Sequence, residues 1–249
     1  MGTERESVMG GGAVGTACAL DLSVDAHVHT GFSAGRDAVG VVVSAADRTG
    51  LTALTFADQA GPDTTWLTAY ADAVRRARHR TEMRLRVAAE VEVVRADGWL
   101  ALPPDLAQLD ALSVAVSGLP IGDDVLDARE LRRMLAAGAL TAGLVAEILV
   151  TTTVKGIERA SRYVPSQLAR PLALLAQAGV DDAVAGPELV GELASACRTT
   201  GTVVEISEAW RSPSPRLVEM LRDAGVTLVP ASDARYAAEV GRWQYLRRV

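Results

Sequence analysis

The sequence predicts a single α/β domain built as a parallel barrel. Apolar runs of strand length alternate with helical patterns along most of the 249 residues. Hydrophobic residues make up 49% of the chain, which is enough for a sizeable core. No repeat, low-complexity block or linker divides the chain, and a single barrel of this length is common. We therefore expect one barrel domain over residues 20–249, preceded by a flexible tail over residues 1–19.

Local signals define the expected elements. Glycines at positions 50, 201 and 225 end helical patterns, Pro187 begins one, and Asp127 with Glu130 forms a capping box. In the stretch 142–162, β-branched residues compete with helical spacing, and we expect a helix. After an apolar run over 17–28, the expected strands cover 51–57, 85–94, 110–116, 202–207 and 226–231. The expected helices cover 37–49, 64–81, 142–162, 186–200, 213–224 and 236–247, with another beginning near 127.

Charge and cysteine content narrow the class of partner. The formal charge of −6 and the pI near 5.2 argue against duplex DNA or an anionic membrane as the main partner. No apolar stretch reaches membrane length, and the first residues lack the positive flank of a secretory signal. Cys18 and Cys197 lie far apart, which suits free thiols in a reducing compartment. We expect a cytoplasmic protein that binds a small molecule.

Two of the three histidines lie in the segment Asp25-Ala-His27-Val-His29-Thr30. Side chains alternate along a strand, so the rings of His27 and His29 are expected on the same side. Placed in this way, two imidazoles can bind one divalent cation, and Asp25 could orient a ring from behind.

Further candidate residues lie at the expected ends of strands, where barrels place their active sites. Besides the histidine pair, Glu90 lies on a middle strand and Asp233 follows the last one. Two imidazoles and two carboxylates suit Zn, Mn or Fe better than Ca or Mg. The other polar candidates are Asp58, Gln59, Glu92, Ser117, Glu205, Glu208 and Ser232.

The opening motif, followed by Leu51-Thr-Ala-Leu-Thr-Phe-Ala-Asp58-Gln59, resembles the PHP (polymerase and histidinol phosphatase) superfamily. The similarity continues through Ala-Ala-Glu90-Val-Glu, Leu-Ala-Arg170-Pro and Ala-Ser-Asp233-Ala-Arg235, and it covers about residues 20–245. It implies a distorted seven-stranded barrel that binds up to three metal ions at the strand ends. It also implies hydrolysis of phosphoesters by a metal-activated water.

Carried over residue by residue, the resemblance implies a reduced metal site. Its first site is complete in His27, His29, Glu90 and Asp233, so one divalent ion is expected there. The two histidines of the second site read Ser117 and Arg170, and those of the third read Gly35 or a neighbour, Gln59 and Arg235.

The two arginines allow two interpretations. Arg170 and Arg235 could bind a substrate phosphate or carboxylate through bidentate hydrogen bonds. Alternatively, Arg235 could pair with Asp233 or Glu90 and fill the pocket, so that no metal is needed. We count Asp58 with these two arginines among the candidate catalytic residues, and beside Gln59 we expect it to act as a structural or supporting acid.

Two functions follow from these residues. The first is a divergent PHP-type metal-dependent hydrolase, phosphoesterase-like, that acts on a small anionic substrate such as a phosphorylated metabolite. The second is a catalytically inactive relative that binds a metabolite or a protein partner.

Overall fold

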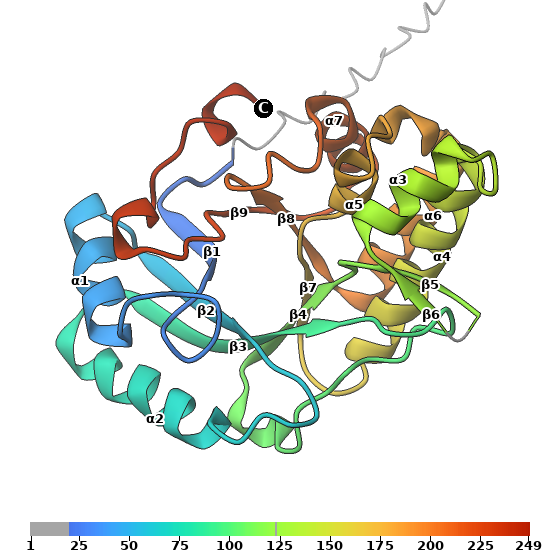
Figure 1. The fold of residues 1–249 in the computed structure, drawn as a ribbon. Helices are drawn as coiled ribbons and strands as arrows, with labels where there is room; N and C mark the ends of the chain where they lie inside the picture. Colours follow the sequence, from blue (N-terminus) through green and yellow to red (C-terminus); the bar gives the residue numbers. More distant parts are fainter. Residues whose placement is uncertain (1–19, 123) are drawn as a thin grey trace, which may run out of the picture.

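The computed structural model describes residues 20–122 and 124–249, so the predicted tail and Cys18 lie outside the described residues. Seven parallel strands form one sheet in the order β1-β2-β3-β4-β7-β8-β9, and helices surround it (Figure 1). The strands are β1 Val24–Val28, β2 Ala53–Gln59, β3 Arg84–Glu92, β4 Ala111–Ala115, β7 Ser166–Leu168, β8 Val203–Ser207 and β9 Leu228–Ala231.

The sheet curls into a nearly closed barrel, which confirms the predicted fold class. The gap between its two edge strands is closed just beyond β9, where the His29 N–H donates to the Ala234 carbonyl at 2.9 Å. The Asp233 N–H donates to the His27 carbonyl at the same distance. Closure therefore joins the predicted histidine motif of β1 directly to the predicted aspartate after β9.

Helices cover the outside of the barrel, and most lie where the sequence predicts them. The Asp127 capping box is present, and Gly50 and Gly201 end their helices in the left-handed conformation. None of the described helices combines the length and apolarity needed to cross a membrane. The helices are α1 Val39–Thr49, α2 Leu67–Ala77, α3 Ala128–Ala136, α4 Ala142–Ala160, α5 Ala173–Gln177, α6 Pro187–Thr200 and α7 Pro215–Asp223.

Three features differ from the sequence prediction. The expected helix over 236–247 is wrong: two short 3-10 turns, Ala237–Glu239 and Leu246–Arg248, stand there, separated by Gly241 at φ 65°. The prediction missed β7 and α5, which are too short to show a periodic pattern. It also missed the hairpin of β5 (Leu119–Ile121) and β6 (Asp124–Leu126).

The two faces of the sheet differ in chemistry because side chains alternate along each strand. The face toward the helices carries large apolar side chains such as Leu54, Phe56 and Leu112, all fully buried. The barrel interior is narrow and holds a small separate cluster of Ala57, Ala88 and Ala111. Small residues there leave room for longer polar side chains further along the strands.

Those polar side chains form one layer because the strands are paired in register. Gln59 of β2 is level with Glu90 of β3, Glu90 with Ser113 of β4, and Ser113 with Gln167 of β7. The register between β1 and β2 shifts between Asp25 and Val28, the kind of irregularity that redirects a side chain. His27 lies within that irregular stretch and enters the same layer.

Candidate metal centre

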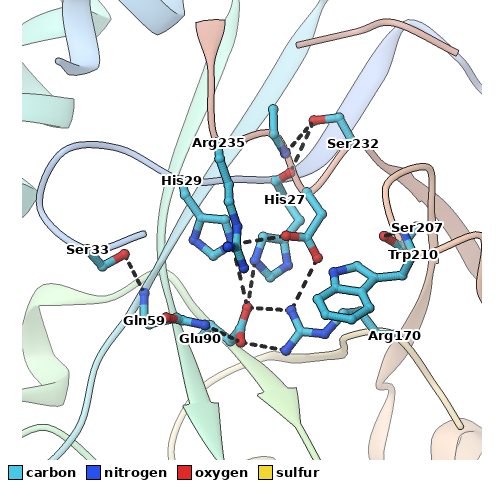
Figure 2. Close-up of polar contacts among 12 residues, drawn as sticks. His27, His29, Ser33, Gln59, Glu90, Arg170, Ser207, Trp210, Ser232 and Arg235 are labelled. Atoms are coloured by element: carbon cyan, nitrogen blue, oxygen red, sulfur yellow. Dashed lines mark hydrogen bonds and ion pairs between the residues drawn. The ribbon is translucent and has the colours of Figure 1, made fainter. Parts of the chain in front are cut away.

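The rings of His27 and His29 converge inside the barrel, as the sequence predicts. Their centroids are 4.8 Å apart at an interplanar angle of 60°, and both side chains are fully buried (Figure 2). His27 belongs to β1, whereas His29 follows the strand and is held by its hydrogen bond to Ala234.

Glu90 of β3 and Asp233, just after β9, both approach the histidine pair. His27, His29 and Glu90 can each offer a ligand atom within 4.8 Å of the other two. The separations are 3.0 Å from His27 Nε2 to Glu90 Oε2, 3.8 Å from His29 Nε2 to Glu90 Oε2 and 3.1 Å from His29 Nε2 to Asp233 Oδ1. Ligands about 2.1 Å from one metal ion lie about 3.0–3.6 Å from each other, so His27, His29 and Glu90 lie near the spacing that one ion needs. Asp233 approaches His29 but does not belong to the group whose ligand atoms all lie within 4.8 Å of one another.

Two buried ring nitrogens, His27 Nε2 and His29 Nδ1, have no hydrogen-bond partner among the described residues. The contact of 3.0 Å between His27 Nε2 and Glu90 Oε2 therefore lacks the alignment of a hydrogen bond. Buried polar atoms are rarely left unpaired. Of these two nitrogens, only His27 Nε2 faces an acid of the centre, because His29 faces Glu90 and Asp233 through Nε2.

Glu205 of β8 orients the His27 ring. Both of its carboxylate oxygens lie 3.0 Å from His27 Nδ1, and Ser113 Oγ and Gln167 Nε2 each donate to it at 2.7 Å. The prediction that Asp25 orients a ring is wrong. Its oxygens instead accept main-chain N–H groups of Ser232 at 2.9 Å and Gly241 at 3.2 Å.

Arg170 lies against the acids of the centre. Its Nη1 donates to Glu90 Oε2 at 2.9 Å and to Asp233 Oδ2 at 3.2 Å, and its Nη2 donates to Glu90 Oε1 at 2.6 Å. The guanidinium also stacks on the Trp210 ring at 5.2 Å (Figure 2). The alternative in which an arginine pairs with these acids is thus found, but with Arg170 in place of Arg235. Asp233 Oδ1 still faces His29.

The charges of the centre are not balanced by its own residues. The centre holds three carboxylates, Glu90, Glu205 and Asp233, and one guanidinium, that of Arg170, which contacts Glu90 and Asp233; two negative charges are left uncompensated. Burial alone would raise the pKa of Glu90, but His27 and Arg170 hold it well below its usual range. Burial opposes protonation of His27 as well, yet Glu205 and Glu90 raise its pKa well above normal. A proton on His27 compensates one charge, whereas a divalent cation compensates both.

Asp58 belongs to a separate network. It accepts hydrogen bonds from the Thr30 N–H at 2.9 Å, Thr30 Oγ1 at 2.7 Å and Ser33 Oγ at 2.5 Å. These contacts hold the loop after β1 and give Asp58 the structural role that the sequence indicates; a catalytic role stays a prediction. Its neighbour Gln59 reaches Glu90 Oε1 through Nε2 at 3.4 Å.

Arg235 is exposed and forms no ion pair among the described residues. It lines a cavity of about 770 Å³ at the mouth of the barrel together with Asp233 and Trp210. Figure 2 places its side chain above the histidine pair. Its position permits the predicted contact with a substrate anion, whereas the ion pairs of Arg170 compete with such a contact.

In the part of the chain that the structure describes, three of the four non-glycine residues with positive φ lie at this site: Arg170 at 45°, Arg211 at 49° and Asp233 at 54°. Left-handed backbone at such residues costs about 1–3 kcal/mol each, and it concentrates at functional sites. The sequence offers no local signal for these conformations.

Comparison with known proteins assigns no family. No family model matches the chain, and no curated protein matches it either. The solved structures that resemble it have low sequence identity to this chain. An HpcH/HpaI aldolase from Desulfitobacterium hafniense DCB-2 is 12% identical at a TM-score of 0.36, with 84% of this chain and 85% of the aldolase covered. A D-hydantoinase is 12% identical at 0.34, with 83% and 45% covered. A short-chain dehydrogenase from Oenococcus oeni PSU-1 is 11% identical at 0.30, with 85% and 97% covered. At these scores the likeness assigns no activity, and the strand pairing within the chain itself defines the barrel.

Proposed function

We propose that this protein is a PHP-type metal-dependent hydrolase that uses one divalent cation and acts on a small anionic substrate. His27, His29, Glu90 and Asp233 would hold the ion, with Zn, Mn or Fe as the fitting metals. The proposal joins the buried cluster of donors to the resemblance of the sequence to that superfamily.

One observation carries the proposal: the His27 ring is fixed at one nitrogen and unpartnered at the other. Glu205 holds Nδ1, so Nε2 points at Glu90 Oε2 without a hydrogen bond. A carboxylate behind the ring is the usual support of a histidine that binds metal, because it fixes the tautomer and raises the basicity of the free nitrogen. A ring nitrogen and a carboxylate oxygen 3.0 Å apart require a positive charge, either a proton on the ring or a bound metal ion, and we propose the metal ion.

The residues of the chain would divide the work as follows. A bound divalent cation supplies Lewis acidity and a water that is nucleophilic at neutral pH. Arg170 keeps Glu90 and Asp233 ionised and fixed in position, and it supplies a positive charge next to the ion. Because its guanidinium bridges both acids, Arg170 serves in the place of a further metal ion.

Turnover by reloaded protein tests this function. Chelator-treated protein should gain hydrolytic activity on phosphomonoesters or other small anionic esters and amides when Zn²⁺, Mn²⁺ or Fe²⁺ is added back. His29→Gln should abolish that activity, and His79→Gln, at the exposed third histidine, should leave it unchanged. No turnover of any such substrate by protein that holds the metal would contradict the hydrolase.

A catalytically inactive binding protein is the second candidate, and the ion pairs of Arg170 favour it. They place a positive charge against Glu90 and Asp233 without any metal. This candidate predicts a folded protein that takes up no stoichiometric metal and still binds small anions.

A further inference from the structure

The cavity at the mouth of the barrel has a chemistry that the metal centre does not explain. It lies between the loop after β8 and the segment after β9, and it holds about 770 Å³. That volume is in the range of small-molecule sites. Asp233 lines it, so the cavity borders the proposed metal centre.

Three arginines line this cavity: Arg211, Arg235 and Arg242. All three side chains are exposed, and none forms an ion pair within the described ranges. Exposed guanidinium groups that converge on one cavity bind carboxylates and phosphates, because each offers a planar pair of donors.

The acids that line the cavity accept hydrogen bonds from groups other than the side chains of these three arginines. Glu208 accepts the N–H groups of Tyr245 at 2.8 Å and Leu246 at 3.1 Å. Glu239 accepts the N–H groups of Arg235 at 2.9 Å and Tyr236 at 3.1 Å. Asp233 is held by His29 and Arg170. Within the described ranges none of these acids forms an ion pair with Arg211, Arg235 or Arg242, so the donors of the three guanidinium groups can meet an anion.

Two aromatic rings complete the lining. Trp210 is 37% exposed and Tyr236 is 52% exposed, although both line the same cavity. One part of the Trp210 ring stacks on Arg170, which fixes its orientation beside the centre (Figure 2). Exposed aromatic surface in a concave site favours a ligand with a flat apolar part.

We propose that this cavity binds a planar ring that carries an anionic group, phosphate or carboxylate, and so sets the substrate class of the proposed hydrolase. The inference rests on the proposed function, because the reacting bond would lie at Asp233 and the metal. The arginines would hold the anion, and the ring would lie against Trp210 and Tyr236.

Calorimetric titration with three stable probes tests the cavity in chelator-treated and in Zn²⁺-loaded protein. Phenylphosphonate carries a ring and an anion, benzoate replaces the phosphonate by a carboxylate, and methylphosphonate lacks the ring. Whichever of phenylphosphonate and benzoate binds more tightly should bind at least tenfold more tightly than methylphosphonate. The tighter of phenylphosphonate and benzoate identifies the anionic group.

Variants locate the binding. The double variant Arg235→Gln, Arg242→Gln should weaken binding of the preferred probe at least tenfold, and Lys at both positions should restore part of it. Tyr236→Ser should reduce the advantage of the ring. Arg216→Gln, at an exposed arginine of α7 outside the cavity, should change binding less than twofold.

The inference would be overturned if neither phenylphosphonate nor benzoate bound more tightly than methylphosphonate, or if the double variant left binding of the tighter probe unchanged. Its failure is distinguishable from failure of the hydrolase. If the probe still binds but no substrate is turned over, the hydrolase proposal is wrong and the cavity proposal stands. If the double variant turns over substrate with an unchanged KM, the cavity proposal is wrong and the hydrolase proposal stands.

Discussion

Two groups of buried carboxylates in this barrel differ in what surrounds them. Asp25 and Asp58 accept hydrogen bonds from main-chain N–H groups and hydroxyls, so their partners are neutral. Glu90, Glu205 and Asp233 instead face imidazoles and a guanidinium. The first group joins strands and loops, whereas the second keeps charge that needs a cation. Burial of an acid therefore does not by itself mark a functional site; the charge and alignment of its partners do.

Removal of the Arg170 guanidinium should cause a larger loss of stability than any other change considered below. Arg170→Met should lower the free energy of unfolding by about 3–5 kcal/mol, because it leaves two buried acids without their partner. Chemical denaturation of metal-free protein measures this loss. The matched control is Arg78→Met at the surface pair with Asp110, whose side chains are 39% and 42% exposed. That change should cost no more than about 1 kcal/mol. Equal losses in the two variants would contradict the assignment of Arg170.

Glu205→Gln tests the carboxylate behind His27. Loss of a group that supports a metal-binding histidine typically weakens metal affinity about 10–100-fold. The His27 ring would lose its charged partner at Nδ1 while the metal donors themselves stay unchanged. Competition with a fluorescent zinc chelator measures the affinity. An unchanged affinity would show that Glu205 serves only the core.

Arg170 and Glu205 also show how much of the site could be predicted from the sequence. The barrel, most helices and the approach of His27, His29 and Glu90 to each other follow from periodicity, caps and strand ends. Glu205 as the partner of His27 could not, because the two are 178 residues apart and their contact depends on strand register. Arg170, and not Arg235, pairs with the acids of the centre. This pairing depends on left-handed backbone at Arg170, which no sequence pattern predicts. The PHP assignment, the cytoplasmic location and the absence of nucleic-acid and membrane partners stay predictions.

The raised pKa of His27 gives metal binding a direction with pH. Burial opposes protonation, but Glu205 and Glu90 outweigh it and raise this pKa well above normal. A metal ion competes with a proton for the ring, so metal affinity should rise with pH, by up to about tenfold per pH unit over the range in which the metal-free ring is protonated. Titration at several pH values measures the slope. A flat profile would contradict the role of His27.

Asp25→Asn should have the smallest effect on metal affinity, within about twofold, because Asp25 touches neither ring. It should cost about 1–3 kcal/mol of stability through a buried N–H left unpaired. Burial raises the pKa of Asp25 to about 6. A raised pKa stabilises the folded protein below pH 4, and this contribution is lost as pH rises through 6. The stability gap between wild type and variant should accordingly narrow over that window, as measured by denaturation. A gap that widens would contradict the assignment.

The metal content of the purified, reloaded chain tests the central claim most directly. After incubation with Zn²⁺, Mn²⁺ or Fe²⁺ and removal of free ions, elemental analysis should find one ion per chain in wild type and in His79→Gln. The same analysis should find none in His27→Ala. Wild-type protein that retains no stoichiometric metal, or a His27→Ala variant that retains as much as wild type, would contradict the account.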